Sequence, residues 1–464
     1  MPETSAVDLS EPRRIHIVGV GGSGMSAIAT VLAAMGHQVS GSDLKDSATL
    51  ARLRAQGVAA ATGHGPERVG DAEVVAVSTA VPERNPEVQA ARQRGIPVVR
   101  RAEVLAAIAA TRRCLAVSGT HGKTTTSSML ALVLVAAGVR PSFIVGGELN
   151  EIGGGAVWDR GEWFVVEADE SDGTFLELPA EIAVVTNVEA DHLDYYGSMA
   201  AIEAAFDRFL AQAPGPNIVC ADEPLAFVLA RRHRATTYGV HPDADFQMRD
   251  VVTDRAGVRF RLESGGQPLG AVALPVPGTH NARNATAAIV AAVQLGVPFA
   301  VAADALRRYT GVARRFEFRG EQDGVTFVDD YAHNPGKVAA VLDAAHQGGW
   351  RRVIAVFQPH RYTRTSALWR EFGPAFAAAD VAVITDIYAA GEAPRPGVTG
   401  KLIVNAVLEA SPWKRVAWLP RRADILRWLR SELRPGDLCL TLGAGDITSL
   451  PDDVMTPAHG ETAP

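Results

Sequence analysis

The amino-acid sequence predicts an α/β protein of three domains, and three observations support that fold class. Short runs of β-branched residues alternate with Ala-rich helical stretches along almost the whole chain, as in parallel sheets covered by helices. The 464 residues exceed what one hydrophobic core usually organises. Two glycine-rich loops each follow a predicted strand and precede a predicted helix. We expect a Rossmann-like N-terminal domain over residues 1–111, a central domain like those of phosphate-loop ATPases over 112–318, and a C-terminal Rossmann-like domain over 319–464.

The N-terminal domain opens with the pattern of a dinucleotide-binding site. A short buried strand over residues 15–18 precedes a helix over 25–35, and a second strand follows the helix. Three glycines between the first strand and the helix fit GxGxxG, namely Gly19, Gly21 and Gly24. Asp43 stands near the position from which an acidic residue binds a ribose hydroxyl. Taken alone, this pattern indicates an NAD-dependent oxidoreductase.

The central domain begins with a second glycine-rich loop, VSGTHGKTTT, over residues 117–126. Backbone N–H groups of such a loop, together with the N-terminus of the following helix, bind phosphate oxygens. Lys123 would reach the terminal phosphates and the Thr124 hydroxyl a magnesium ion. Val117 stands where GxxxxGK[ST] has its first glycine, so a plain glycine-rich turn is the alternative. An oxidoreductase needs one nucleotide site, whereas an enzyme that uses ATP on a nucleotide-linked substrate needs both loops.

Two acidic segments follow buried strands of the same domain. EADESDGTF begins at Glu167 and NVEADHLDYYG begins at Asn187. Mg²⁺ prefers oxygen ligands and substrate phosphates, so carboxylates at strand ends beside a phosphate loop indicate a magnesium site. His192 could be a metal ligand or a proton acceptor. Solvated acidic loops are the alternative, in which some of the carboxylates only cap the next helix.

The rest of the chain predicts an insert and a third sheet. Alternating residues over 246–274 suggest antiparallel strands. The third domain contains the strands of VTFVDDYAHNP, VIAVFQPH, VAVITDIY and LCLTLGAGDI. Each of these strands ends in polar or glycine residues, where open α/β sheets usually bind ligands.

Composition narrows the classes of function. The formal net charge of −7 gives no basic surface for nucleic acid. Three cysteines, Cys114, Cys220 and Cys439, lack paired or metal-ligand spacing, and we expect them to be buried and reduced. The N-terminus has no secretory pattern, and the apolar run at residues 129–139 is far shorter than the ~20 residues of a membrane span. We expect a cytoplasmic protein without membrane insertion.

Several motifs, taken in order, resemble those of the Mur ligases, which are ATP-dependent amide-forming enzymes of peptidoglycan precursor synthesis. They are GTHGKTTT, EADESDGTF, NVEADHLD, PGTHNARNA, RRFE, DDYAHNP and FQPHRYTRT. GVGGSGMSAIA, SGSD, FQPHRYTRT and GAGDI resemble the alanine-adding branch of that family, and the match runs over residues 14–448. In this family the first glycine loop holds the diphosphate of a UDP-sugar. The resemblance therefore implies no hydride chemistry, and it places Asp43 near the uridine.

The resemblance implies the following contacts. The UDP-sugar would contact Gly19, Gly21, Gly22, Ser23, Gly24, Asp43, Ser78 and Thr79. ATP would contact Gly119, Thr120, His121, Gly122, Lys123, Thr124, Thr125, Asn281, Asn284, Arg315 and Asp330. The incoming L-alanine would contact His360, Arg361 and Arg364, and Mg²⁺, replaceable by Mn²⁺, would contact Thr124, Glu167 and His192. Lys123, His192 and Arg315 would be the catalytic residues.

The implied reaction activates the lactyl carboxylate of UDP-N-acetylmuramate as an acyl phosphate, which the amine of L-alanine then attacks. The family commonly reads DDYGHHP where this chain reads DDYAHNP. Asn334 cannot titrate, so we assign it no acid–base role, and we expect no carbamylated lysine. The implied enzyme serves cell-wall biogenesis, and thereby cell shape and division, as a monomer or weak homodimer.

Three alternatives remain at this point. A recycling ligase would attach a tripeptide to the same UDP-sugar. An NAD-dependent oxidoreductase would explain the first glycine loop but not GTHGKTTT or DDYAHNP. A phosphate-loop ATPase acting as a switch or motor would explain GTHGKTTT but not the first loop.

Overall fold

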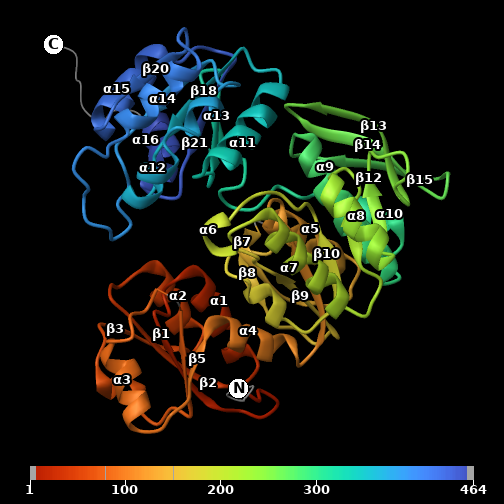
Figure 1. The fold of residues 1–464 in the computed structure, drawn as a ribbon, viewed down its shortest axis with the longest axis vertical. Helices are drawn as coiled ribbons and strands as arrows, with labels where there is room; N and C mark the ends of the chain where they lie inside the picture. The colour runs from red at the N-terminus through yellow and green to blue at the C-terminus, as the bar shows by residue number, and fades with distance from the viewer. Residues whose placement is uncertain (1–6, 79, 150, 457–464) are drawn as a thin grey trace. The chain divides into compact units, whose positions relative to one another are not determined.

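The computed structural model describes residues 7–78, 80–149 and 151–456, which form three sheets with helices between their strands (Figure 1). Most strand pairs are parallel, so the predicted α/β class is confirmed. The described residues pack as two compact units. One unit holds residues 7–250, 260–272 and 283–309, and the other holds residues 251–259, 273–282 and 310–456.

The first sheet has the order β3-β2-β1-β4-β5, and all of its pairs are parallel. Its strands are β1 (Arg14–Val18), β2 (Gln38–Asp43), β3 (Ala59–Thr62), β4 (Val74–Val77) and β5 (Val98–Arg100). Its helices are α1 (Ser23–Ala34), α2 (Ala48–Ala55), η1 (Pro66–Val69), α3 (Pro86–Gln93) and α4 (Arg101–Ala109). The strand order reverses between β1 and β4, and such a point at the carboxyl ends of the strands is where open sheets bind ligands. The first glycine loop lies at this point.

The second sheet has the order β15-β14-β13-β12-β11-β10-β6-β9-β7-β8. Its strands are β6 (Arg113–Ser118), β7 (Ser142–Leu149), β8 (Gly154–Val157), β9 (Trp163–Glu167), β10 (Ala180–Val185), β11 (Ile218–Cys220), β12 (Thr236–Gly239), β13 (Phe246–Asp254), β14 (Gly257–Ser264) and β15 (Gln267–Leu274). Its helices are α5 (Lys123–Ala136), η2 (Thr174–Glu177), α6 (Leu193–Tyr196), α7 (Met199–Gln212), α8 (Pro224–His233), α9 (Thr279–Gln294) and α10 (Phe299–Leu306). β6 lies between β9 and β10 and is parallel to both. The phosphate loop and the two acidic segments therefore leave the same edge of the sheet side by side.

The third sheet has the order β16-β17-β21-β18-β19-β20, in which only the edge pair β16–β17 is antiparallel among the described strands. Its strands are β16 (Glu317–Gln322), β17 (Val325–Asp330), β18 (Arg352–Phe357), β19 (Val381–Ile384), β20 (Arg415–Trp418) and β21 (Asp437–Leu442). Its helices are α11 (Pro335–Gln347), α12 (Tyr362–Leu368), α13 (Phe372–Ala375), α14 (Lys401–Ala410), α15 (Arg422–Glu432), η3 (Asp446–Ser449) and α16 (Leu450–Met455). DDYAHNP follows β17 and FQPHRYTRT follows β18, so both lie at the carboxyl edge of this sheet.

The central strands are buried on both faces and form the cores. Cys114, Cys220 and Cys439 are buried and free, as predicted, and burial raises the pKa of each thiol to about 12. Within residues 7–78, 80–149 and 151–456, no helix is long and apolar enough to cross a membrane.

A buried hydrogen-bond network around Glu87 connects the end of β2 to the first glycine loop. Glu87 is fully buried, and its carboxylate accepts hydrogen bonds from the Ser42 hydroxyl (2.5 Å) and from the Gly65 N–H (3.1 Å). The Ser42 carbonyl in turn accepts the N–H of Gly19 at 2.8 Å. Because Ser42 donates its only proton to Glu87, His64 Nδ1, 2.8 Å from the Ser42 hydroxyl, must be the donor of that contact. The network thus fixes the end of β2 against the loop.

We expect Glu87→Gln to lower the free energy of unfolding by about 1–3 kcal/mol at neutral pH, since buried donors lose their charged partner. Burial acts to raise the pKa of Glu87, but hydrogen bonds from His16, Ser42 and Gly65 hold it below its ordinary value of 4.5. A lowered folded-state pKa stabilises the fold above 4.5, and this contribution disappears as the pH falls through the folded value. The difference between wild type and variant, measured by urea unfolding at several pH values, should therefore shrink below pH 4.5.

The exposed Glu67 offers a matched control, because Glu67→Gln should leave stability unchanged at every pH. A difference between wild type and Glu87→Gln that stays constant with pH would contradict the charged state assigned to Glu87.

Candidate active site

The phosphate loop is a four-residue turn whose two glycines cannot be replaced without a shift of the backbone. β6 ends at Ser118 and α5 begins at Lys123. Gly119 has φ +136° and Gly122 has φ +82°, which L side chains rarely adopt. A Cβ on Gly119 would strike the Thr186 hydroxyl, and a Cβ on Gly122 would lie 2.5 Å from Oδ1 of Asn284. Close packing against β10 and α9 thus explains both glycines.

The segment after β10 holds this loop in place. The His121 N–H donates to Oδ1 of Asn187 (2.8 Å), and the Thr186 hydroxyl donates to the His121 carbonyl (2.5 Å). The Glu189 N–H donates to the Thr120 hydroxyl at 2.9 Å. Sequence reasoning assigned this segment to metal binding and missed Asn187 as a loop anchor. The signal available was its position directly after a strand beside the loop.

Lys123 lies inside the loop with its side chain 11% exposed. Its ammonium donates to the Gly119 carbonyl at 2.8 Å and lies 2.7 Å from Oε2 of Glu170. Burial opposes the charged form, but Glu170 and Asp169 hold the pKa of Lys123 above its ordinary value. Lys123 is therefore a cation at the N-terminus of α5, where a phosphate would lie. Sequence reasoning left the role of Glu170 open, and the structure makes it the ion-pair partner of this lysine.

Of the predicted metal ligands, His192 lies near the same carboxylate. His192, at φ +53°, places Nε2 at 3.8 Å from Oε1 of Glu170. Glu167 accepts the Gly146 N–H at 2.8 Å. In the described part of the chain, no three His, Cys, Asp or Glu side chains form a ready metal cluster. Metal binding by Thr124, Glu167 and His192 therefore remains a prediction.

Glu170 nevertheless suits a hard cation. Both of its oxygens are buried and, apart from the ion pair with Lys123, accept no hydrogen bond of normal geometry from a described residue. Burial raises the pKa of this carboxyl, an effect that the Lys123 cation opposes. An oxygen ligand with unused acceptor capacity beside a phosphate loop is what Mg²⁺ requires.

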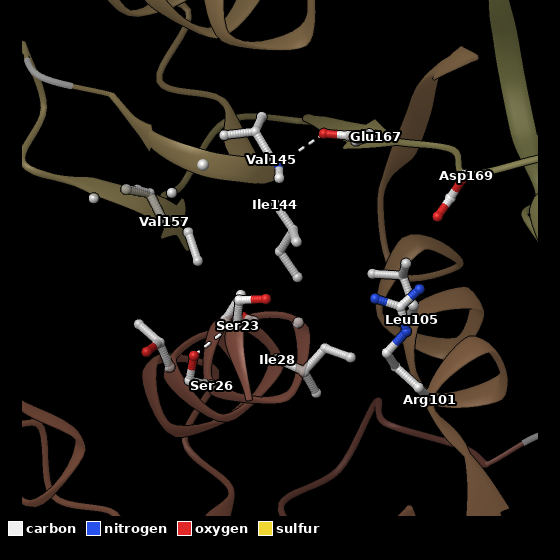
Figure 2. Close-up of a pocket in the computed structure, with 18 of the residues that line it drawn as sticks. Ser23, Ser26, Ile28, Arg101, Leu105, Ile144, Val145, Val157, Glu167 and Asp169 are labelled. Carbon is white, nitrogen blue, oxygen red and sulfur yellow. Dashed lines mark hydrogen bonds between the residues drawn. The ribbon is translucent and has the colours of Figure 1, made fainter. Parts of the chain in front are cut away.

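A cavity of about 560 Å³ lies over the first glycine loop, within the same compact unit (Figure 2). Gly21, Ser23 and Gly24 of the loop line it, together with α4, β7, β8 and the carboxylates Glu167 and Asp169. The cavity thus joins the loop to the acidic edge beside Lys123. Of the other residues predicted to contact the UDP-sugar, Gly19, Gly22, Asp43 and Ser78 do not line it, and Thr79 lies outside the described residues.

Asp43 has a structural role in addition to any contact with a ligand. It is the last residue of β2, and its Oδ2 accepts the Gly21 N–H at 2.9 Å. The carboxylate therefore fixes the loop backbone directly.

The residues predicted near the adenine differ in their surroundings. Asn284 is buried beside Gly122, as its contact with the loop requires. Asn281 is also buried, but its amide donates to the Pro277 carbonyl at 2.6 Å. Arg283, between them, forms an ion pair with the buried Asp222 and holds the start of α9 against α8.

In the C-terminal unit, Asp330 is buried and lies within electrostatic reach of the half-buried Arg315. Both oxygens of Asp330 accept backbone N–H groups, those of Phe316 (2.8 Å) and Ala332 (2.7 Å), and burial raises its pKa. Asp330 thus supports the backbone around DDYAHNP, and its contact with a ribose stays a prediction. The Arg315 guanidinium lies 5.6 Å from the centre of the Tyr331 ring.

Two neutral histidines face the arginines predicted to bind L-alanine. Arg364 donates to Nδ1 of His360 at 3.1 Å, so that nitrogen is unprotonated and Nε2 carries the hydrogen. His333, which sequence reasoning did not assign, must donate from Nδ1 to the Tyr331 carbonyl (2.8 Å). Burial and Arg364 lower the pKa of His333 to about 3 and that of His360 to about 4. The positive charge here therefore comes from Arg361 and Arg364.

Asn334 acts as a helix cap, which accounts for the departure of DDYAHNP from the family pattern. Its Oδ1 accepts the Lys337 N–H at 2.9 Å, and Pro335 begins α11. Asparagine is among the best N-cap residues, so a titrating side chain is not needed at this position.

We expect Asn334→Ala to destabilise the C-terminal unit by about 1 kcal/mol, because α11 loses its cap. The KM values of the substrates should change little. Thermal unfolding checks the first expectation and steady-state rates the second, with Asn334→Asp as the control that keeps a cap. A loss of rate without a loss of stability would show that Asn334 acts in the chemistry after all.

The geometry of the site by itself indicates a class of enzyme. A buried lysine in a phosphate loop, neighbouring carboxylates and a separate cavity over a second glycine loop fit a ligase that uses ATP to activate a nucleotide-linked substrate. Protein-family models match three consecutive segments: "Mur ligase family, catalytic domain" over residues 14–113, "Mur ligase middle domain" over 117–292 and "Mur ligase, glutamate ligase domain" over 314–445. The chain belongs to the Mur ligase family. Its three-domain α/β architecture and its class as an ATP-dependent amide-forming ligase are thereby confirmed.

Relatives with known names cover almost the whole chain. The UDP-N-acetylmuramate--L-alanine ligase of Pelotomaculum thermopropionicum is 47% identical over 446 residues, 95% of this chain and 96% of that protein. The ligase of the same name from Solidesulfovibrio magneticus is 48% identical over 440 residues, 94% of this chain and 96% of that protein. The crystal structure of UDP-N-acetylmuramate-alanine ligase from Thermotoga maritima matches with a TM-score of 0.81 at 28% identity, covering 95% of this chain and 98% of that chain. None of these relatives supports an oxidoreductase.

Proposed function

We propose that this chain joins L-alanine to the lactyl carboxylate of UDP-N-acetylmuramate in peptidoglycan precursor synthesis. The observation that carries the proposal is the cavity over the first glycine loop, which opens toward the carboxylates beside Lys123. The whole-length similarity to UDP-N-acetylmuramate--L-alanine ligases supports it.

The reaction has two steps. A carboxylate oxygen of the lactyl group attacks the γ-phosphorus of ATP, and the bond from that phosphorus to ADP breaks. The amine nitrogen of L-alanine then attacks the acyl carbon, the bond to phosphate breaks, and the amine releases a proton. The first step brings two anions together, with a repulsion of roughly 4 kcal/mol per charge pair at about 4 Å and an effective dielectric near 20.

Different residues would neutralise charge, hold the metal ion and bind the substrates. Lys123 would neutralise charge on the terminal phosphates, and Arg315 would add a second positive charge there. Thr124, Glu167 and His192, with Glu170, would hold Mg²⁺ or Mn²⁺, which supplies further charge neutralisation. Arg361 and Arg364 would bind the carboxylate of L-alanine, and Gly21, Ser23 and Gly24 the UDP-sugar.

We propose three further properties of the same enzyme. The domain boundaries after residues 111 and 318, the monomeric or weakly dimeric state and the cytoplasmic location are predictions of the sequence.

A phosphate-release assay with ATP and Mg²⁺ tests the proposal. UDP-N-acetylmuramate is supplied with L-alanine, with the tripeptide of the recycling ligases, or with no amine. Release that requires both the UDP-sugar and L-alanine is the expected result. Release only with the tripeptide would assign the recycling reaction instead, and release without any UDP-sugar would contradict the proposed use of the first loop.

A further inference from the structure

Two adjacent arginines at the start of α4 differ in their surroundings. Arg100 is held at the surface by Glu103 and Glu177, which lie 3.3 and 3.0 Å from its guanidinium nitrogens. Arg101 lines the cavity over the first glycine loop, and its side chain reaches into the cavity from α4 on the side of Asp169 (Figure 2). No hydrogen bond or ion pair to another described residue engages the Arg101 guanidinium. A partly buried guanidinium without such a partner has all of its N–H donors available for a ligand.

The position of Arg101 explains the third glycine of the loop. A Cβ on Gly24 would lie 2.5 Å from Nη1 of Arg101 and 3.4 Å from its Cδ. In dinucleotide-binding folds this glycine usually permits close packing of helix against strand. Here it makes room for the guanidinium over the first turn of α1, where loop N–H groups and the helix dipole already favour an anion.

The charged residues around the cavity leave the Arg101 guanidinium available to bind a ligand. Its acidic neighbour Asp169 also faces Lys123, whose Nζ lies 3.9 Å away. Asp169 thus has Lys123 as its cationic partner, and among the described residues Arg101 has no ion-pair partner of its own, so its charge is available to a ligand over the loop.

We propose that Arg101 binds the diphosphate of the nucleotide-sugar and so makes the site select a diphosphate-linked uridine over uridine itself. A planar guanidinium can donate two parallel hydrogen bonds to phosphate oxygens, which a neutral side chain cannot replace. This inference rests on the proposed function, because it concerns the same substrate site.

The test compares Arg101→Gln with wild type in two assays. In ligation, the KM for UDP-N-acetylmuramate should rise by about 10- to 100-fold, while kcat and the KM values of ATP and L-alanine stay within about 2-fold. In calorimetric or competition binding, UDP should lose affinity by a similar factor, whereas uridine should bind as it does to wild type. Arg101→Lys should fall between the two, because it keeps the charge and loses the planar fork.

Arg100→Gln is the matched control, since it removes the same charge one residue away and should leave every constant unchanged. Equal UDP affinity in Arg101→Gln and wild type would overturn the inference. Equal losses for UDP and uridine would also overturn it, because they would indicate a merely structural role. A wild-type protein that binds UDP but performs no ligation would refute the proposed function while leaving the Arg101 comparison readable from UDP binding.

Discussion

Replacing Lys123 by alanine should lower kcat/KM for ligation by roughly 10³-fold, the range seen when one charge-stabilising donor is removed from a catalytic site. The ammonium is buried inside the phosphate loop, 2.7 Å from Glu170, and its pKa lies above the ordinary value, so it is a permanent cation. Without it, Glu170 and Asp169 would face the triphosphate unopposed. Phosphate release at saturating UDP-sugar and L-alanine measures the effect.

The loss must be separated from a loss of folding, because Lys123→Ala also leaves Glu170 buried without its partner. The double variant Lys123→Ala/Glu170→Gln removes that uncompensated charge. It should recover the thermal stability of wild type and remain inactive. Ligation by Lys123→Ala near the wild-type rate would show that the phosphate loop has been assigned wrongly.

The phosphate loop was predictable because its signals are local. A strand, two glycines and a lysine before a helix stand next to one another in the sequence, and the structure places them as the pattern requires. The missing first glycine of GxxxxGK[ST] has a simple explanation. β6 runs on through Ser118, so Val117 is a buried strand residue and the turn begins only at Gly119.

The contacts that sequence reasoning missed are those between segments far apart in the chain. Asn187 anchors the loop only because β10 lies beside β6, and Arg101 reaches Gly24 only because α4 packs near α1. The order of the strands and the packing of the helices determine these contacts, and neither can be read from motifs in a single sequence. Likewise, the protonated nitrogens of His333 and His360 follow from which group each ring meets, a carbonyl or a guanidinium.

Replacing Gly119 by alanine should lower the rate of ATP-dependent ligation by roughly 10²-fold and also destabilise the protein by roughly 2–5 kcal/mol, from backbone strain and overpacking together. At φ +136° an L side chain is strained, and its Cβ would strike the Thr186 hydroxyl and lie 3.0 Å from the Asn187 backbone nitrogen and oxygen. The loop must therefore move away from β10. A displacement of about 1 Å at a reacting centre can reduce a rate ~10²-fold.

Gly138 supplies the control for the strain alone. It has φ +72° at the other end of α5, with open space where a Cβ would go, so Gly138→Ala should cost about 1 kcal/mol and leave the rate unchanged. Denaturant unfolding and phosphate release on both variants distinguish the two effects. If Gly119→Ala behaved like Gly138→Ala, contact with β10 would not fix the loop, and the role of Asn187 as its anchor would fall with it.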